Sequence, residues 1–264
     1  MDYHVHTLHS MDGRQTIDEA CQAMIAQGIQ EFCLTEHIDL GHPDPACDIP
    51  PIWDRWLDEI RQAQIRYPQL IIRTGLEIGD NPACRDRIKR LVNDLPLDFR
   101  LLSLHLVDQM DPYSMPYFDG KTREEAYRRY CEQKFDSVCQ WDDFDSVAHI
   151  GYVAKFSVYQ GEERPLRFRD APDALDGLLK RVIELDKCIE VNTSTWASMG
   201  APLPDVSILK RYIELGGECF TFGSDSHDTA RDGQDIERAK DLVRSLGGKY
   251  QAGFDKRKKV CYRI

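Results

Sequence analysis

Short apolar runs alternate with longer amphipathic segments along almost the whole chain. The short runs are rich in β-branched and aromatic residues, as in buried strands, whereas the longer segments repeat their apolar residues with helical spacing. This alternation favours consecutive strand and helix units around a parallel sheet. Seven strands are predicted, at Asp2–Thr7, Phe32–Thr35, Leu70–Leu76, Phe99–Leu104, Ser146–His149, Cys188–Asn192 and Cys219–Gly223. Lys259–Ile264 could form an outlying eighth strand.

Capping residues predict where several of the helices begin and end. The T-x-x-E pattern at residues 16–19 and 122–125 matches a capping box, and an apolar helical stripe follows each one. Gly28 suits the left-handed residue at the end of the first of these helices. Pro172 and Pro204 each suit the first turn of a further helix. We expect the apolar faces of these helices to pack on the central sheet.

The alternation continues without a linker, a low-complexity tract or an internal repeat, so residues 1–264 are predicted to form one domain. A barrel of strand and helix units fits this α/β pattern best. Segments 41–51 and 108–120 are predicted to be long loops after the second and fourth strands. Loops on that side of such a barrel carry active sites.

Composition narrows the classes of partner. The formal net charge of −11 argues against a nucleic-acid surface, which needs clustered lysine and arginine. The basic run at residues 256–259 is interpreted as a solvated face rather than a nucleic-acid tail. No apolar segment approaches the length of a membrane-spanning helix, and no secretion signal is recognisable.

Cysteine usage points to a reducing compartment. The nine cysteines are an odd number, widely scattered and without a C-x-x-C pair. We therefore expect reduced thiols and a cytoplasmic location. The sequence does not fix an oligomeric state.

Histidines and carboxylates gather at the predicted strand ends. Six of the eight histidines lie there. Because the carboxyl ends of parallel strands meet at one face, residues far apart in the sequence should line a single pocket. The residues concerned are His4, His6, Glu36, His37, Glu77, His105, His149, Asp225 and His227.

This constellation predicts a metal centre. Alternate residues of a strand point the same way, so His4 and His6 can bind one ion together, and Asp225 and His227 repeat that spacing. Taken alone, each histidine is better explained by a hydrogen bond in the core. Taken together, and with Asp12 nearby, the donors are too many for one ion, so we expect two or three divalent ions. Imidazole and carboxylate donors favour zinc, iron or manganese over magnesium or calcium.

Seven motifs carry a resemblance to a known family. The segments "DYHVHT", "LTEHID", "GLEIG", "SLHLVD", "AHIGY", "EVNTS" and "GSDSH" follow one another between Asp2 and His227. In this order they resemble the PHP (polymerase and histidinol phosphatase) family, and in particular its monofunctional histidinol-phosphatase branch. The resemblance implies a distorted (β/α)7 TIM-like barrel with a trinuclear metal site. It agrees with the seven strands predicted above.

The resemblance also implies how the ligands are divided. The first ion would be held by His4, His6, Glu77 and Asp225, the second by Glu77, His105 and His149, and the third by Asp12, His37 and His227.

Roles in catalysis follow from the same resemblance. Glu77, Asp225 and His227 would act in catalysis, and Asp225 could pass a proton. His9 lies outside the motifs, and three roles are open for it: a place at the rim of the pocket, a place behind the metal ligands, and a purely structural role. Glu36 and Asp39 could orient imidazole N–H groups, or could have surface or capping roles.

The implied reaction is hydrolysis of L-histidinol phosphate, a small phosphorylated substrate, to L-histidinol and inorganic phosphate. Two neighbouring ions would lower the pKa of a bridging water, and the resulting hydroxide could attack phosphorus. The third ion would bind a phosphoryl oxygen. Divalent ions would thus supply the attraction for an anion that an acidic protein lacks.

The substrate side departs from the family pattern. Two arginines that grip phosphate in this branch, in the patterns GH-x-x-Y-x-x-RY and NTSG-x-R, correspond here to Lys155 and Ala197. Lysine keeps the charge but loses the planar fork, and alanine removes the contact. Predicted substrate-binding residues are Lys155, three arginines that could compensate for the altered contacts, Arg164, Arg167 and Arg169, and Trp196, which could pack on a substrate ring. A solvated cluster for the arginines and a core position for the tryptophan are the alternatives.

Two other functions stay open. Because two of the expected phosphate-binding arginines are replaced, the protein could instead be a phosphoesterase of the same family that acts on another small phosphate, a nucleotide or an oligonucleotide end. A non-catalytic metal-binding module is the third hypothesis, although the full ligand set and the single domain count against it.

Overall fold

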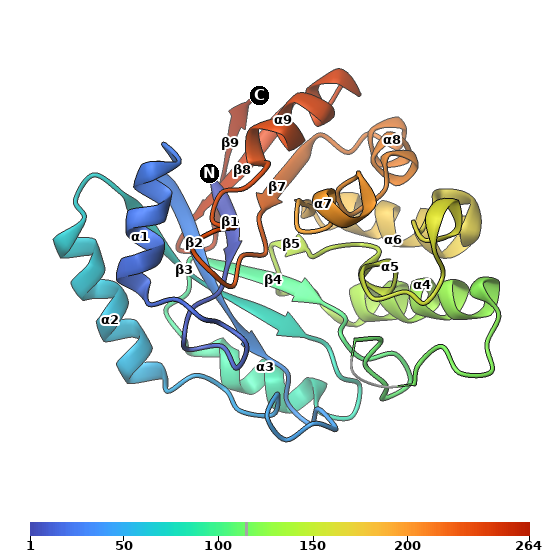
Figure 1. Cartoon of the computed structure of the whole chain (residues 1–264), viewed down its shortest axis with the longest axis horizontal. Helices are drawn as coiled ribbons and strands as arrows, with labels where there is room; N and C mark the ends of the chain where they lie inside the picture. The colour runs from blue at the N-terminus through green and yellow to red at the C-terminus, as the bar shows by residue number, and fades with distance from the viewer. Residues whose placement is uncertain (114–115) are drawn as a thin grey trace.

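The chain forms one curved sheet surrounded by helices (Figure 1). The computed structural model describes residues 1–113 and 116–264. Neighbouring strands follow the chain order from β1 to β9, and all pairs are parallel except β8 with β9. The strands are β1 Asp2–Val5, β2 Glu31–Ile38, β3 Ile71–Gly79, β4 Phe99–Ser103, β5 Ser146–Val147, β6 Cys188–Asn192, β7 Cys219–Gly223, β8 Tyr250–Asp255 and β9 Lys258–Arg263.

The sheet closes into a distorted barrel where β1 meets β7. Val5 and Ser226 form a parallel bridge, and the backbone N–H of His6 donates to the Ser226 carbonyl at 2.8 Å. The β8–β9 hairpin lies beside β1 near both chain ends, where the Gln251 side chain donates to the Met1 carbonyl (Figure 1). All seven main strands of the prediction are present, and the expected outlying strand is β9. The prediction missed β8.

Nine α-helices within the described ranges connect and cover these strands. They are α1 Ile17–Ala26, α2 Trp53–Arg66, α3 Arg85–Asn93, α4 Arg123–Gln140, α5 Tyr152–Lys155, α6 Pro172–Glu184, α7 Trp196–Met199, α8 Val206–Glu214 and α9 Ile236–Ser245, with short 3-10 turns at Gly161–Glu163 and Phe168–Asp170. None of the helices in the described ranges is long and apolar enough to cross a membrane.

The capping predictions hold at three helices and fail at one. Both capping boxes form, at residues 16–19 and 122–125, and Gly28 has a φ of +71° just after α1. Pro172 is the first residue of α6. The prediction that Pro204 opens a helix was wrong. Asp205 caps α8 by accepting from the Ser207 N–H, so the proline stands before the cap.

Two strands, β1 and β5, end two residues earlier than predicted, because site residues take over their hydrogen bonds. After β1, the N–H of Thr7 donates to Glu36 Oε2 at 3.1 Å. After β5, the N–H of His149 donates to Glu190 Oε2 at 2.7 Å. Buried carboxylates thus replace the neighbouring strand as hydrogen-bond acceptors at the carboxyl ends of the strands.

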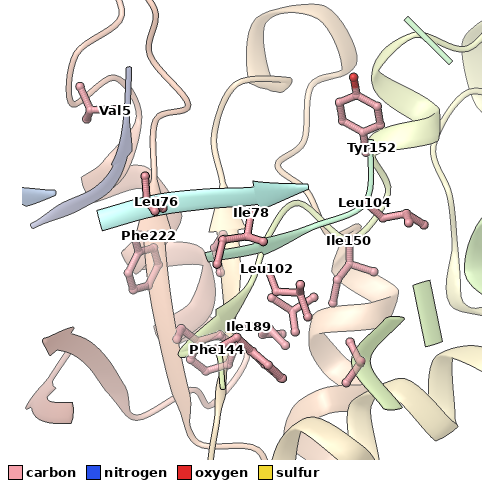
Figure 2. Packing of buried hydrophobic residues seen from close by; sticks show 14 of the residues in the cluster. Val5, Leu76, Ile78, Leu102, Leu104, Phe144, Ile150, Tyr152, Ile189 and Phe222 are labelled. Atoms are coloured by element: carbon pink, nitrogen blue, oxygen red, sulfur yellow. The ribbon is translucent and has the colours of Figure 1, made fainter. Parts of the chain in front are cut away.

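The barrel is apolar at its base and along its outer wall. Tyr3, Phe99 and Phe254 fill the base with ring centroids 5.1 Å and 5.0 Å apart for the Tyr3–Phe99 and Phe99–Phe254 pairs. Leu102 and Ile189 belong to the larger core between the strands and the helices (Figure 2). The buried histidines lie at the opposite end of the barrel, at or just after the carboxyl ends of the strands.

Candidate metal centre

Glu77, near the end of β3, lies at the middle of a ring of imidazoles. It is 1 % exposed. Its Oε2 lies 3.2 Å from His4 Nε2 and 3.1 Å from His37 Nδ1, and its Oε1 lies 3.0 Å from His105 Nε2 and 2.7 Å from His149 Nε2. Five different strands or strand ends therefore meet at one carboxylate.

Asp225 and Asp12 complete the ring. Asp225 Oδ1 lies 3.7 Å from His4 Nε2 and 3.8 Å from His6 Nε2. Its φ of +54° is unusual for a residue with a side chain, and such backbone strain is often found at functional sites. On the outer side, Asp12 Oδ2 lies 3.0 Å from His227 Nε2.

Several buried nitrogen and oxygen atoms of the ring lie close to one another, yet make no hydrogen bond of acceptable geometry in the described part of the chain. They include His4 Nε2, His6 Nε2, His37 Nδ1, Glu77 Oε2 and His227 Nε2. Buried polar atoms are rarely left unpaired, so unpaired lone pairs that face one another fit cations between them.

Four triplets in this ring have donor atoms within 4.8 Å of one another. The triplets are His4–His6–Asp225, His4–Glu77–His149, His37–Glu77–His105 and His6–His37–His227. Because they share members, the donors form one continuous cluster rather than separate sites. All nine predicted ligands lie in this cluster or, for Asp12, at its edge.

Electrostatics in the cluster couple metal binding to protons. Burial alone would raise the pKa of Glu77, but His4, His105 and His37 hold it well below its usual range. Burial likewise opposes protonation of His37, yet Glu77, Asp39 and Asp12 raise its pKa to about 9. Without cations, the carboxylates therefore keep a proton on His37, which a cation must displace, whereas burial lowers the pKa of His6 and His149.

Second partners fix the orientation of the imidazoles. Glu190 Oε1 accepts from His4 Nδ1 at 2.6 Å, and Asp39 Oδ1 accepts from His105 Nδ1 at 2.7 Å. Ser10 links His6 Nδ1 to Glu36, which accepts from the Ser10 hydroxyl at 2.5 Å. The structure thus places Glu36 and Asp39 in orienting positions. Sequence reasoning missed Glu190, although its two-residue spacing from Asn192 in β6 aims both side chains into the barrel.

His9 lies apart from the cluster. Its Nε2 is 2.9 Å from Glu59 Oε2 of α2, and it lines a neighbouring cleft with Leu8 and Ile52. The structural role considered for this residue agrees with that position.

The cluster forms the floor of a pocket of about 410 Å³. Lys155 enters it from α5, with Nζ 2.6 Å from Asp225 Oδ2. The loops after β2 and β4, together with α5 and the residue that follows it, supply a further wall that is acidic and aromatic. Its residues include Asp39, His42, Asp44, Asp111, Tyr113, Tyr152 and Phe156. Residues 114 and 115 of the predicted loop 108–120 lie outside the described residues.

Four of the predicted substrate-binding residues lie outside this pocket lining. Arg164 donates to the carbonyls of Ala154 and Lys155, at 3.2 Å and 2.8 Å. Arg167 pairs with Glu162 at the surface.

Arg169 and Trp196 lie elsewhere as well. Arg169 borders a separate surface depression beside α4. Trp196 is 7 % exposed, and the guanidinium of Arg238 stacks 4.3 Å from its ring. For these four residues the structure agrees with the structural or solvated alternatives.

Comparison with known proteins agrees with this geometry. The sequence model of the PHP domain matches residues 2–194. The chain is 28 % identical to the histidinol-phosphatase of Lactococcus lactis, over 98 % of this chain and 97 % of that protein. It is 25 % identical to a probable histidinol-phosphatase of Thermotoga maritima, over 100 % and 99 % of the two chains.

Solved structures share the fold. A crystal structure of histidinol phosphate phosphatase from Lactococcus lactis, complexed with zinc, L-histidinol and phosphate, superposes with a TM-score of 0.89, covering 98 % of each chain. A putative histidinol phosphatase from Listeria monocytogenes, 20 % identical, superposes with a TM-score of 0.76 over 90 % of this chain and 98 % of that one, which shows the common fold.

Proposed function

Because this chain belongs to the PHP domain family, we propose that it is a metal-dependent phosphomonoesterase that hydrolyses L-histidinol phosphate to L-histidinol and inorganic phosphate. The observation that carries this proposal is the ring of imidazoles around Glu77, whose unpaired donor atoms face one another at the floor of the pocket. Full-length similarity to a histidinol-phosphatase supports the choice of substrate. The proposal treats residues 1–264 as one cytoplasmic domain.

The donor set fits two or three divalent ions, of zinc, iron or manganese. In the proposed division, His4, His6, Glu77 and Asp225 hold the first, Glu77, His105 and His149 the second, and Asp12, His37 and His227 the third. When bound, such ions lower the pKa of coordinated water and offset negative charge on a phosphoryl group.

Protein side chains position the substrate around that centre. Lys155 lies at the pocket edge with its ammonium group beside Asp225, so it can reach a phosphoryl oxygen next to the cluster. Asp225 faces both Lys155 and the imidazole ring, which is the position required of a residue that exchanges a proton during turnover.

The acidic and aromatic wall favours a cationic leaving group. Asp44 and Asp111 lie in loops that face the cluster, and the rings of Tyr113 and Phe156 lie beside them, 4.7 Å apart. L-Histidinol carries an ammonium group and an imidazole, which suit carboxylates and aromatic faces. A nucleotide would bring further negative charge to this wall.

Steady-state kinetics test the proposal. The protein is purified without chelator, its metals are measured, and turnover is followed with L-histidinol phosphate, an aryl phosphate and a dinucleotide, each with added zinc or manganese. We expect kcat/KM to be highest for L-histidinol phosphate. A preference for the dinucleotide would support the oligonucleotide alternative. Silence on all three substrates with metals bound would support the non-catalytic one.

A further inference from the structure

Two residues with basic side chains belong to the described lining of the pocket beside its histidines, Lys155 and Arg14. The ammonium group of Lys155 is 2.6 Å from Asp225 and is thus partly neutralised. Arg14 is exposed, and within the described part of the chain no carboxylate pairs with its guanidinium. The N–H groups of the Arg14 guanidinium are therefore available to donate hydrogen bonds to a ligand in the pocket above the metal centre.

The backbone beneath Arg14 is held rigidly against the site. Its N–H donates to the carbonyl of His227 at 2.8 Å. The next residue, Gln15, accepts from the Leu8 N–H through its carbonyl at 2.8 Å and donates from its side chain to the His6 carbonyl at 3.0 Å. Arg14 is thus anchored to two of the imidazole-bearing segments.

Gly13 makes this tight path possible. A Cβ added at Gly13 would lie 1.8 Å from the Thr7 carbonyl oxygen, so only glycine allows the loop to pass so close to the end of β1. The loop therefore places Asp12 beside His227, and Arg14, two residues further on, at the lining of the pocket. Because the backbone of Arg14 is held in place and its guanidinium is exposed and unpaired among the described residues, this side chain is suited to bind a group that arrives with the substrate.

We propose that Arg14 binds the phosphoryl group of the substrate together with Lys155, and so supplies a bidentate contact that the described pocket lining otherwise lacks. This inference rests on the proposed phosphomonoesterase activity. A guanidinium can donate two parallel hydrogen bonds to phosphate oxygens, which a lysine cannot. It also adds positive charge beside the carboxylates that line the pocket.

The test compares Arg14→Gln and Arg14→Lys with Arg87→Gln. Arg87 is an exposed arginine of α3 outside the pocket, so its substitution changes the net charge equally. Binding of inorganic phosphate to each metal-loaded protein is measured by calorimetry, which needs no turnover. Inhibition by phosphate and by L-histidinol is then measured separately, and metal content is determined for every variant.

We expect Arg14→Gln to weaken phosphate binding by about 10- to 100-fold, which is the loss of a charge-assisted pair, and to lower kcat/KM by a similar factor. Inhibition by L-histidinol, metal content and the Arg87→Gln protein should stay unchanged, and Arg14→Lys should recover part of the affinity. Equal phosphate affinity in Arg14→Gln and Arg87→Gln would overturn the inference, as would loss of metal from Arg14→Gln. If the wild-type protein binds phosphate through Arg14 but does not turn over L-histidinol phosphate, the choice of substrate fails and the inference stands.

Discussion

At the scale of single residues, the ring around Glu77 shows how many donors depend on one carboxylate. Both of its oxygens face imidazoles, and Ser103 donates a further hydrogen bond to Oε1 at 2.6 Å. With so many neighbours, removal of a single imidazole should disturb the shared cluster rather than one isolated ion. The two histidines His105 and His9 allow that expectation to be tested.

His105→Ala should lower kcat/KM by at least about 100-fold, because even the loss of a group that only supports a ligand costs 10- to 100-fold. The fold should persist, since the barrel core lies elsewhere. Turnover, bound metal and circular dichroism measure these effects. His9→Ala is the matched control, because His9 pairs with Glu59 outside the cluster. Full activity of His105→Ala would contradict the ligand assignment.

Glu190 allows a test of orientation without removal of a ligand. Glu190→Gln keeps the shape of the side chain but loses the charge that holds His4 Nδ1. We expect a 10- to 100-fold decrease in metal affinity or kcat/KM, measured by competition with a chelator and by turnover. Glu184→Gln, on the exposed face of α6, serves as control. Equal metal affinity and turnover in the two variants would show that His4 is positioned without Glu190.

At the scale of elements, the sequence predicted the seven main strands and the end of the barrel at which the polar groups gather. These followed from local patterns, because buried parallel strands are apolar runs and their ends are marked by polar residues. β8 was missed because Gly253 interrupts its apolar pattern. Tyr3 leaves little room for a side chain at this position, since its hydroxyl would lie 3.1 Å from an added Cβ. Glu190 was missed because it lies between two apolar residues inside β6 rather than at the end of the strand. Such features depend on contacts between distant segments.

Lys134 of α4 is a further feature that no local pattern revealed. It is 0 % exposed, and its Nζ donates to the Leu102 carbonyl at 3.1 Å. Burial lowers its pKa from 10.5 to about 7, despite the opposing charges of Glu77 and Glu190. Between pH 7 and 10.5 the unfolded chain therefore binds a proton that the folded chain does not, so this lysine makes stability rise with pH across that window.

Lys134→Met should accordingly stabilise the protein most at or below pH 7, where the buried charge costs most, and the gain should vanish towards pH 10.5. The Leu102 carbonyl keeps a donor, because the Ala148 N–H reaches it at 2.9 Å. Melting temperatures of both proteins at pH 6.5 and pH 9.5 measure the effect, with a gain of a few degrees expected at the lower pH. A pH-independent change would indicate that packing, rather than charge, decides the outcome.

At the scale of the whole molecule, the barrel places the aromatic cluster of Tyr3, Phe99 and Phe254 at one end and the ring of imidazoles and carboxylates at the other. The whole protein is acidic, with a formal net charge of −11. The carboxylates of the mouth raise the pKa of several imidazoles, including His37 to about 9, and those of His4 and His105 well above their usual range. Cations and protons therefore compete for the same donor atoms. Folding stability should then depend on metal and on pH together.

Removal of the metals with a chelator should lower the melting temperature, since an ion that binds only the folded state stabilises it by mass action. The difference between metal-loaded and metal-free protein should be larger at pH 8 than at pH 6, because the protons that each ion displaces from the imidazoles are released more readily at the higher pH. The measurement is thermal unfolding at both pH values with zinc or manganese in fixed excess over the protein, and with magnesium as the control ion. Equal shifts of the melting temperature at the two pH values would mean that the imidazoles do not lose protons when the metal binds. An equal shift with magnesium would show that nitrogen ligands do not make the site prefer zinc or manganese.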